Sequence, residues 1–256
     1  MVAEESIQNI GVIGLGRMGT AIASNILKSG FNVIVYNRTA DKTRSLVEAG
    51  ALKATSPKEV ARKSDVLLTS LRDDHALLDV VSGEEGILSG LQQQQQQQQQ
   101  PNRIHIGTST ISPALSSQLA EMHTAHGCSY LAAPVLGNPS VANEAKLTTF
   151  VAGDPKDIER CNRLFNAYCQ KVINIGNEHA SADTLKLIAN YVLLALIDLM
   201  GHVYALCEKT NIDLQLINQL IGMIFGYPGL QQYSNRILTR DFDNVGFDLL
   251  SAFKNV

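Results

Sequence analysis

A glycine-rich turn near the start of the chain restricts the fold more than any other feature of the sequence. The motif "GLGRMG" (14–19) directly follows the apolar run "IGVI" (10–13) and precedes an amphipathic stretch. In such a motif Gly14 permits a tight turn, Gly16 lets a phosphate approach the backbone, and Gly19 allows close packing of helix on strand. The motif therefore predicts a strand, a turn and a helix at the start of an α/β sheet.

The first half of the chain continues this pattern, because short apolar runs alternate with amphipathic stretches. The runs are continuous and rich in β-branched residues, which is typical of parallel strands covered on both faces. After Gly176 the pattern changes, and the rest of the chain is typical of helix. We therefore expect strands at 9–14, 32–37, 65–71, 103–109, 128–135, 146–154 and 171–176, helices over 40–48, 113–126 and 155–168, one helix ending at Lys28 and one beginning near Asp73.

These elements predict a doubly wound parallel sheet of the Rossmann type, followed by an all-α domain. The expected domains are 1–177 and 178–256. Nine consecutive glutamines, 92–100, are expected to form a surface loop in the first domain. A neutral repeat expansion accounts for this segment, and we assign it no function.

The composition is that of an ordinary globular protein, with 45% hydrophobic residues, 18% charged residues and a net charge of −3. This charge gives no general attraction to nucleic acid or acidic membranes. The four cysteines form no CxxC pair, so we expect buried, reduced thiols in an intracellular protein. The first strand leaves no room for a targeting peptide, and the apolar run 191–200 is short and contains Asp198. We expect a cytoplasmic protein without a membrane span.

The end of the second expected strand indicates which dinucleotide the glycine turn binds. NAD-specific sites place an acid there, which binds the ribose 2′-hydroxyl. This chain has Asn37-Arg38-Thr39 instead, and its next acid is Asp41. An arginine binds a 2′-phosphate with two hydrogen bonds, whereas a carboxylate repels it. The sequence therefore predicts NADP(H) in preference to NAD(H).

A lysine lies in the first turns of a long apolar helix, "DTLKLIANYVLLALIDLM" (183–200). Lys186 and Asn190 are four residues apart, so their side chains lie on one face of the helix. The run that follows is apolar nearly all round, which predicts a helix buried against neighbours. Lys186 either extends to solvent from the helix start or serves as an acid–base group whose pKa is lowered by burial.

Several stretches together resemble the β-hydroxyacid dehydrogenase family of the 6-phosphogluconate dehydrogenase superfamily. This family includes 3-hydroxyisobutyrate dehydrogenases and glyoxylate or succinic semialdehyde reductases. The resemblance implies a Rossmann domain, a long interdomain helix, and a helical domain that dimerises. It also implies hydride transfer between nicotinamide and a small hydroxy acid, semialdehyde or 2-oxo acid. The stretches are "GVIGLGRMGTAIASNILKSGFNVIVYNRT", "TSTISP", "APVLG", "KLTTFVAGD", "LKLIAN" and "RDFDNVGF".

The resemblance implies roles for individual residues. Lys186 falls on the family's catalytic lysine, Asn190 on the asparagine that accompanies it, and Ser109 on a serine beside the substrate carboxylate. Together with the glycine turn, the resemblance gives cofactor-binding residues Gly14, Leu15, Gly16, Arg17, Met18, Gly19, Asn37, Arg38, Thr39, Leu71, Arg72, Thr110 and Lys254, and substrate-binding residues Ser109, Leu136, Gly137, Asn138 and Phe247.

The chain also departs from the family pattern. Many members have Ser-Gly-Gly where this chain has Leu136-Gly137-Asn138, although backbone N–H groups at 137–138 still suit a carboxylate. Relatives continue beyond the position of Val256, so we expect a shortened helical domain. The other departures are Gly107 in place of aspartate, Arg72 in place of proline, and Asn255 in place of aspartate.

Two alternatives stay open beside the hydroxyacid dehydrogenase. An imine reductase has the same two-domain plan and NADPH preference, although such enzymes commonly lack a lysine at the position of Lys186. A non-catalytic scaffold of the same fold would bind the cofactor and oligomerise.

HExxH and GxSxG motifs are missing, so metal and hydrolase chemistry are not expected. The apolar run 191–200 predicts a homodimer or homotetramer formed through the helical domain.

Overall fold

The computed structural model of the chain describes residues 7–92, 103–226, 228–241 and 253. The chain divides into two compact units, 1–186 and 187–256, and each is described by itself. The dividing point lies within a helix, whereas the sequence predicted a boundary before that helix. Most of the glutamine segment 92–100 lies outside the described residues.

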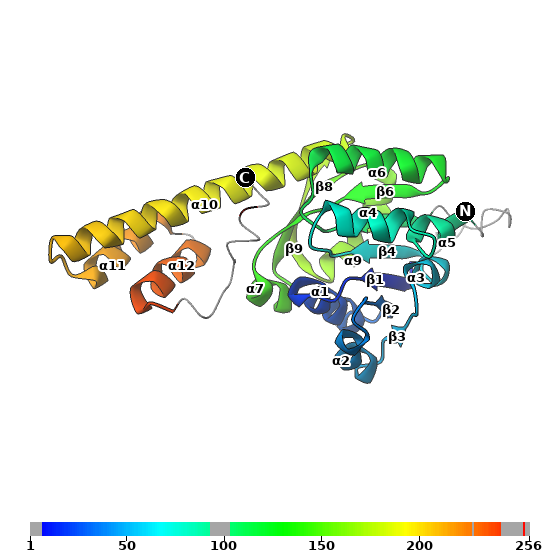
Figure 1. Cartoon of the computed structure of the whole chain (residues 1–256), viewed down its shortest axis with the longest axis horizontal. Helices are drawn as coiled ribbons and strands as arrows, with labels where there is room; N and C mark the ends of the chain where they lie inside the picture. Colours follow the sequence, from blue (N-terminus) through cyan, green and yellow to red (C-terminus); the bar gives the residue numbers. More distant parts are fainter. Residues whose placement is uncertain (1–6, 93–102, 227, 242–252, 254–256) are drawn as a thin grey trace. The chain divides into compact units, whose positions relative to one another are not determined.

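Unit 1 is an α/β domain in which the described strands form one sheet (Figure 1). The strand order is β3-β2-β1-β4-β5-β6-β8-β7, and β9 pairs with β8. The strands are β1 (Asn9–Ile13), β2 (Asn32–Tyr36), β3 (Leu52–Lys53), β4 (Val66–Thr69), β5 (Ile104–Gly107), β6 (Ser129–Ala132), β7 (Val135–Leu136), β8 (Leu147–Ala152) and β9 (Cys169–Gly176).

Helices connect these strands, and the longest of them continues into unit 2. Unit 1 contains α1 (Arg17–Lys28), a 3₁₀ turn η1 (Ala40–Thr43), α2 (Arg44–Glu48), α3 (Pro57–Lys63), α4 (Asp74–Ser82), α5 (Ile87–Gln92), α6 (Pro113–Ala125), α7 (Pro139–Asn143), α8 (Pro155–Arg160) and α9 (Asn162–Asn166). The remaining helices are α10 (His179–Lys209), α11 (Leu214–Phe225) and α12 (Pro228–Thr239).

The sheet confirms the predicted α/β fold and corrects it at one edge. The six neighbouring strands β3, β2, β1, β4, β5 and β6 are parallel, as predicted. Strand β8, however, is antiparallel to both β6 and β7. The predicted strand 128–135 is two strands, because the chain turns at Ala133 and Pro134 and β7 pairs elsewhere. The predicted helix 155–168 is two short helices separated at Cys161, and short helices at 57–63 and 139–143 had not been predicted.

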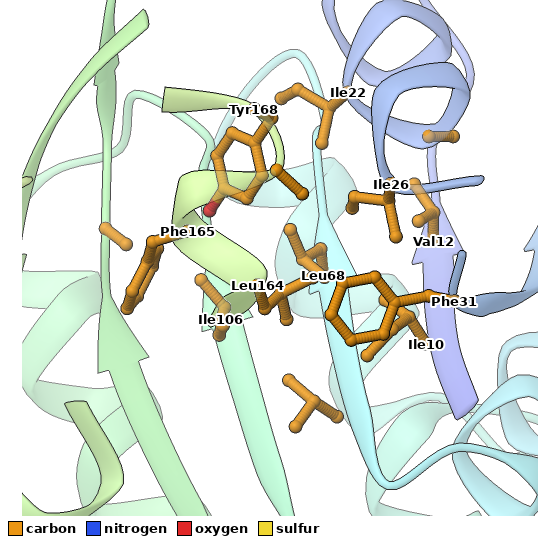
Figure 2. Close-up of a cluster of buried hydrophobic side chains, with 14 of the residues drawn as sticks. Ile10, Val12, Ile22, Ile26, Phe31, Leu68, Ile106, Leu164, Phe165 and Tyr168 are labelled. Carbon is orange, nitrogen blue, oxygen red and sulfur yellow. The ribbon is translucent and has the colours of Figure 1, made fainter. Parts of the chain in front are cut away.

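The core of unit 1 lies between the sheet and helices α1 and α9 (Figure 2). Strands β1, β4 and β5 contribute apolar side chains to one layer, and the two helices contribute the facing layer. All four cysteines are free and buried, as expected. The central residues of this core are Ile10, Val12, Ile22, Ile26, Phe31, Leu68, Ile106, Leu164, Phe165 and Tyr168.

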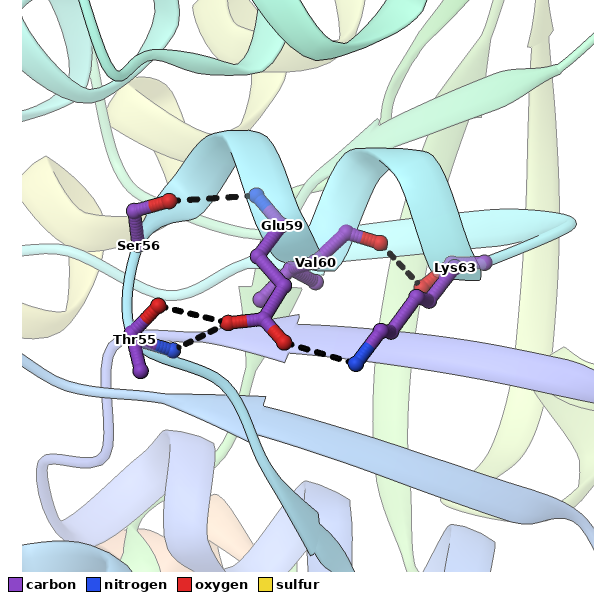
Figure 3. A network of polar contacts seen from close by, with 6 residues as sticks. Thr55, Ser56, Glu59, Val60 and Lys63 are labelled. Carbon is purple, nitrogen blue, oxygen red and sulfur yellow. Dashed lines mark hydrogen bonds and ion pairs between the residues drawn. The ribbon is translucent and has the colours of Figure 1, made fainter.

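Helix α3 begins with a well-formed cap (Figure 3). The Ser56 hydroxyl accepts a hydrogen bond from the Glu59 amide (3.2 Å), and Pro57 occupies the first turn. The Glu59 carboxylate in turn accepts from the amide and hydroxyl of Thr55 (2.7 and 2.6 Å) and pairs with Lys63 (2.6 Å). Side chains thereby satisfy donors that a helix start leaves unpaired.

Unit 2 has a small core of its own and an extensive exposed apolar surface. The core forms around Met200, Tyr204 and Ile221. The predicted burial of the run 191–200 is wrong for this chain by itself, because Tyr191 and Val192 are 63% and 50% exposed. We name as the apolar face of unit 2 the exposed residues Tyr191, Val192, Leu199, Leu206, Leu216, Leu220, Met223 and Ile224.

Helix α10 has 31 residues and, by length and composition alone, is long and apolar enough to cross a membrane. The sequence predicts a long apolar helix but no membrane span, because the run 191–200 is short and contains Asp198. A core helix of a water-soluble protein has the same length and composition. Only 17% of the most apolar window is buried in the described structure.

Candidate functional site

The glycine turn has the geometry that its sequence predicted. Gly14 has φ +93°, a conformation that side chains rarely adopt, and a β-carbon there would collide with the Ser70 carbonyl. A β-carbon on Gly19 would collide with the Gly14 carbonyl, so this glycine lets α1 begin close to the strand. A β-carbon on Gly16 would instead meet nothing within 4 Å. Two glycines therefore serve packing, and the third keeps the backbone open to a ligand.

The N-terminus of α1 suits an anion. Its N-cap is Gly16, which has no side chain to pair with the first amides, and the first turn contains no acid. The helix has twelve residues, so its dipole adds positive potential at this end. Arg17 is exposed, Met18 is half-buried and Leu15 is buried. These residues fit the pyrophosphate of a dinucleotide.

Asn37 at the end of β2 holds the glycine turn in place. Its side-chain oxygen accepts a hydrogen bond from the Leu15 amide (2.9 Å), and its side-chain nitrogen donates to the Thr39 carbonyl (2.9 Å). Arg38 and Thr39 are exposed beside it. The sequence had placed Asn37 among the cofactor-binding residues, and the structure adds this supporting role.

Parallel pairing brings the next predicted residues to the same edge of the sheet. In β1, β4 and β5 the last residues Ile13, Thr69 and Gly107 are aligned as neighbours. The segments that follow are therefore adjacent, and the Ser109 hydroxyl accepts a hydrogen bond from the Leu71 amide (2.8 Å). The strand order reverses at β1 and β4, where doubly wound sheets bind their ligands.

The residues around Ser109 differ in exposure. Ser109 is 5% exposed, and its hydroxyl hydrogen is still able to donate because its oxygen is the acceptor for Leu71. Thr110 and Leu71 are half-buried. Arg72 is exposed and pairs with Asp73 (2.8 Å).

The segment 136–138 forms a turn between β7 and α7. Gly137 is exposed and has φ +141°, which a residue with a side chain rarely adopts. The Asn138 side chain caps α7 by accepting from the Val141 amide (3.0 Å). The sequence left open whether this turn keeps the family's carboxylate-binding geometry, and Leu136 contributes only a half-buried apolar side chain.

Lys186 and Asn190 are both buried on α10, with 7% and 4% of their surfaces exposed. Burial is the condition under which a lysine is most useful as an acid–base group. It excludes the alternative in which Lys186 simply extends into solvent. Lys254 and Phe247, the two late residues of the predicted site, lie outside the described residues.

A buried polar cluster beside Ser109 had not been predicted. Asp183 on α10 is 1% exposed, and within the described residues neither of its carboxylate oxygens makes a hydrogen bond of ordinary geometry. The same holds for the Ser116 and Tyr130 hydroxyls. Burial raises the pKa of Asp183 to about 7, although the nearby Ser116 hydroxyl and Ile111 amide lower it in part. An acid three residues before a lysine was the available sequence signal.

Two buried histidines, His105 on β5 and His123 on α6, extend this polar region. The two ring nitrogens of His105 each make a hydrogen bond. Nε2 contacts Thr69 Oγ1, and Nδ1 contacts His123 Nε2 (2.9 Å each). Burial lowers the pKa of His123 to about 4, against the opposing effect of its contact with the Leu119 carbonyl (2.7 Å). Burial and the neighbouring His123 also lower the pKa of His105. Within the described residues, three or more such side chains do not gather into a metal-binding group.

Comparisons with known proteins agree with this geometry. A model of the NAD binding domain of 6-phosphogluconate dehydrogenase matches residues 9–176. The chain is 34% identical over 246 residues to the uncharacterized oxidoreductase YfjR of Bacillus subtilis, which covers 96% of this chain and 83% of that protein. It is 32% identical over 242 residues to the probable 3-hydroxyisobutyrate dehydrogenase-like 1, mitochondrial, of Arabidopsis thaliana, over 91% of this chain and 68% of that protein.

A solved structure is similar to most of this chain. The imine reductase from Myxococcus stipitatus in complex with NADP+ has a TM-score of 0.73 at 23% identity, covering 92% of this chain and 78% of that chain. This identity supports a common fold and no more. The family model matches more than half of the chain, and both relatives are more than 30% identical over nine tenths of it. The chain therefore belongs to the NAD(P)-binding oxidoreductase family of the 3-hydroxyisobutyrate dehydrogenases, whose cofactor domain is of the 6-phosphogluconate dehydrogenase type.

Proposed function

We propose that the protein is an NADP(H)-dependent dehydrogenase or reductase, which interconverts a small hydroxy acid and the corresponding semialdehyde or 2-oxo acid. The observation that carries the proposal is the burial of Lys186 on α10, in a chain whose glycine turn is open at Gly16. A charged lysine is costly to bury unless it is paired and hydrogen-bonded, so the buried position of Lys186 is informative. Proton transfer to a carbonyl oxygen is a task that suits it.

The side chains divide the chemistry between them. The nicotinamide cofactor supplies or accepts the hydride when it is bound. Lys186 donates a proton to the substrate oxygen as the alcohol forms, and in its neutral form takes the proton back in the oxidising direction. Asn190 orients the lysine or the substrate hydroxyl. Ser109 donates a hydrogen bond to the substrate carboxylate, together with the backbone amides at 137–138.

The first experiment replaces Lys186 with methionine, which retains the length and apolar stem of the side chain. Turnover of NADPH should fall about 10²–10⁴-fold, the usual contribution of a general acid. Affinity for NADPH should hardly change, because the glycine turn provides that binding. The assay is NADPH oxidation with glyoxylate, succinic semialdehyde and methylmalonate semialdehyde. A well-folded Lys186→Met protein that keeps most of its activity would exclude this mechanism.

The second experiment tests the choice of cofactor at Arg38, which is exposed at the end of β2. Arg38→Asp should weaken NADPH binding about 10–100-fold, since one charge-assisted contact is lost and a repulsive one is gained. NADH binding should change little. Titration of both cofactors by fluorescence measures this, with Arg44→Asp as an exposed control elsewhere. Equal affinity of the wild-type protein for NADH and NADPH would contradict the assignment.

The same assays separate the alternatives. An imine reductase would oxidise NADPH with cyclic imines rather than aldehydes, and the shared fold with one such enzyme makes this a direct comparison. A scaffold would bind NADPH without turnover of any substrate in the panel. We further propose a cytoplasmic enzyme that acts on a small carboxylate, without nucleic acid or membrane, and that forms a homodimer or homotetramer through unit 2.

A further inference from the structure

The segment that carries Ser109 and Thr110 is held in place by two neighbouring elements. On one side the Leu71 amide donates to the Ser109 hydroxyl (2.8 Å). At the far end, Asp74 at the start of α4 accepts hydrogen bonds from the Ser112 amide (3.0 Å) and hydroxyl (2.5 Å). Ile111, between these two anchors, is 3% exposed.

Helix α10 contributes a third side chain to this segment. The Asp183 carboxyl is near the Ile111 amide and the Ser116 hydroxyl, both of which favour its charged form. Asp183 is 1% exposed and Ser116 is completely buried, so solvent does not take the place of these contacts. A buried carboxyl with incomplete hydrogen bonds is costly, which makes its position informative.

Tyr130 completes the surroundings of this carboxyl. A β-carbon on Gly107 would collide with the Tyr130 hydroxyl, so the phenol occupies space that this glycine leaves. Burial and the nearby charge of Asp183 raise the pKa of Tyr130 well above its usual value. The hydroxyl therefore keeps its proton at neutral pH. The His179 ring stacks on Tyr130 at 5.9 Å, and its Nε2 contacts the Tyr130 carbonyl (2.9 Å).

Asp183 lies three residues before Lys186, and side chains with this spacing are neighbours on a helix surface. Both are buried. We propose that Asp183 is a positioning residue, which binds the segment after Ser109 and so fixes the place of Lys186 relative to the serine. The inference rests on the proposed function of Lys186. Without Asp183, the first turns of α10 lose their polar attachment to the segment 109–112.

Several titratable groups surround Asp183. Asp74 on α4 raises the pKa of Asp183 by its negative charge, and Tyr130 on β6 faces the carboxyl. His105 and His123 lie next to the Tyr130 ring, with centroid distances of 5.2 and 5.4 Å. His179 and Lys186 lie on α10 itself. Burial lowers the pKa of His105 and of His123, so both are neutral at neutral pH, whereas the pKa of Asp183 is raised to about 7 and its charge changes there.

The experiment compares Asp183→Asn and Asp183→Ala with Asp198→Asn, an exposed aspartate on the same helix. Turnover should fall about tenfold for asparagine and up to about 10²-fold for alanine, as expected for a misplaced acid–base group. The limb of the pH–turnover profile near neutrality should disappear in Asp183→Asn and remain in Asp198→Asn. NADPH affinity should be unchanged in all three variants.

A second readout does not depend on activity. Hydrogen–deuterium exchange of the peptide covering 108–115 should be faster in Asp183→Asn than in wild type, and unchanged in Asp198→Asn. A pH profile of wild-type shape together with unchanged exchange would overturn the inference. If instead Lys186→Met keeps full activity while exchange responds to Asp183→Asn, the proposed function fails and the attachment itself stands.

Discussion

Buried titratable side chains make the stability of unit 1 depend on pH in two opposite senses. His123 is held neutral by burial, with its pKa lowered to about 4, so only the unfolded chain takes up this proton as the pH falls below about 6.5. Its contribution to stability is therefore complete above that pH and is lost toward pH 4. The difference corresponds to at most about 3 kcal/mol for this residue.

Asp183 acts in the other direction. Its pKa is raised to about 7, so the folded chain keeps a proton that the unfolded chain releases from about pH 4 upward. Stability from this group is therefore greatest in acid and is lost as the pH rises through neutrality. Asp183→Asn should make the protein more stable above pH 7, which would be unusual for the loss of a residue that only supports the fold.

We predict from this balance that His123→Gln reduces the acid sensitivity of the protein. Glutamine keeps a polar group near His105 and does not titrate. Both proteins carry Asp183→Asn, so that the opposing group is removed. The urea midpoint, measured at several pH values from neutral to about 5, should vary less in the protein that also carries His123→Gln than in the one that keeps His123. Parallel pH dependences of the two proteins would contradict the assignment.

At the scale of single elements, the cap of α3 illustrates how a short helix is stabilised. Glu59→Ala removes the bonds to Thr55 and the ion pair with Lys63, and the free energy of unfolding should fall by about 1 kcal/mol. Val60 and Ala61 of this helix are buried, so loss of the cap also weakens the packing of the helix in unit 1. The control is Glu48→Ala, because Glu48 makes one exposed pair with Arg44.

A control loss of a few tenths of a kcal/mol is expected for such a surface pair. Denaturant unfolding of the three proteins measures both values. The cap contributes less than the structure indicates if the two variants lose equal stability.

The sequence predicted the glycine turn because its main cause is local, in the spacing of Gly14, Gly16 and Gly19. The hydrogen bond that this turn makes to Asn37, which follows another strand, was not predicted. Helix α3 was missed although Ser56, Pro57 and Glu59 form a recognisable start signal.

Other features have non-local causes that periodicity does not contain. The antiparallel pairing of β7 with β8 depends on Val135 meeting Thr149. In the site, Ser109 and Leu71 were both predicted as site residues from the family resemblance. The cluster of Ser116, Tyr130 and Asp183 was not, because only the folded sheet brings them together.

At the scale of the whole molecule, the apolar face of unit 2 requires an explanation. Its members include Leu206 and Met223, which are 61% and 82% exposed. Monomeric proteins rarely expose large contiguous apolar patches, whereas subunit interfaces are rich in them. This surface supports the proposal of self-association through unit 2. A helix that carries Asp198 and His202 as an exposed pair is also better suited to a partner protein than to lipid.

We therefore predict that Met223→Asp weakens self-association at least tenfold, about 1.4 kcal/mol, because a charge would enter the interface. Light scattering across a range of protein concentrations measures the change. Leu52→Asp provides the matched control, since Leu52 is an exposed apolar residue of unit 1 (62%). A wild-type protein that is monomeric at micromolar concentration would rule out the proposed assembly.

The close fit of Gly107 and Tyr130 constrains how this chain is able to evolve. An aspartate at position 107 would collide with the Tyr130 phenol, and a smaller residue at position 130 alone would leave a void. Either single step is unfavourable, so the two positions are epistatic and must change together.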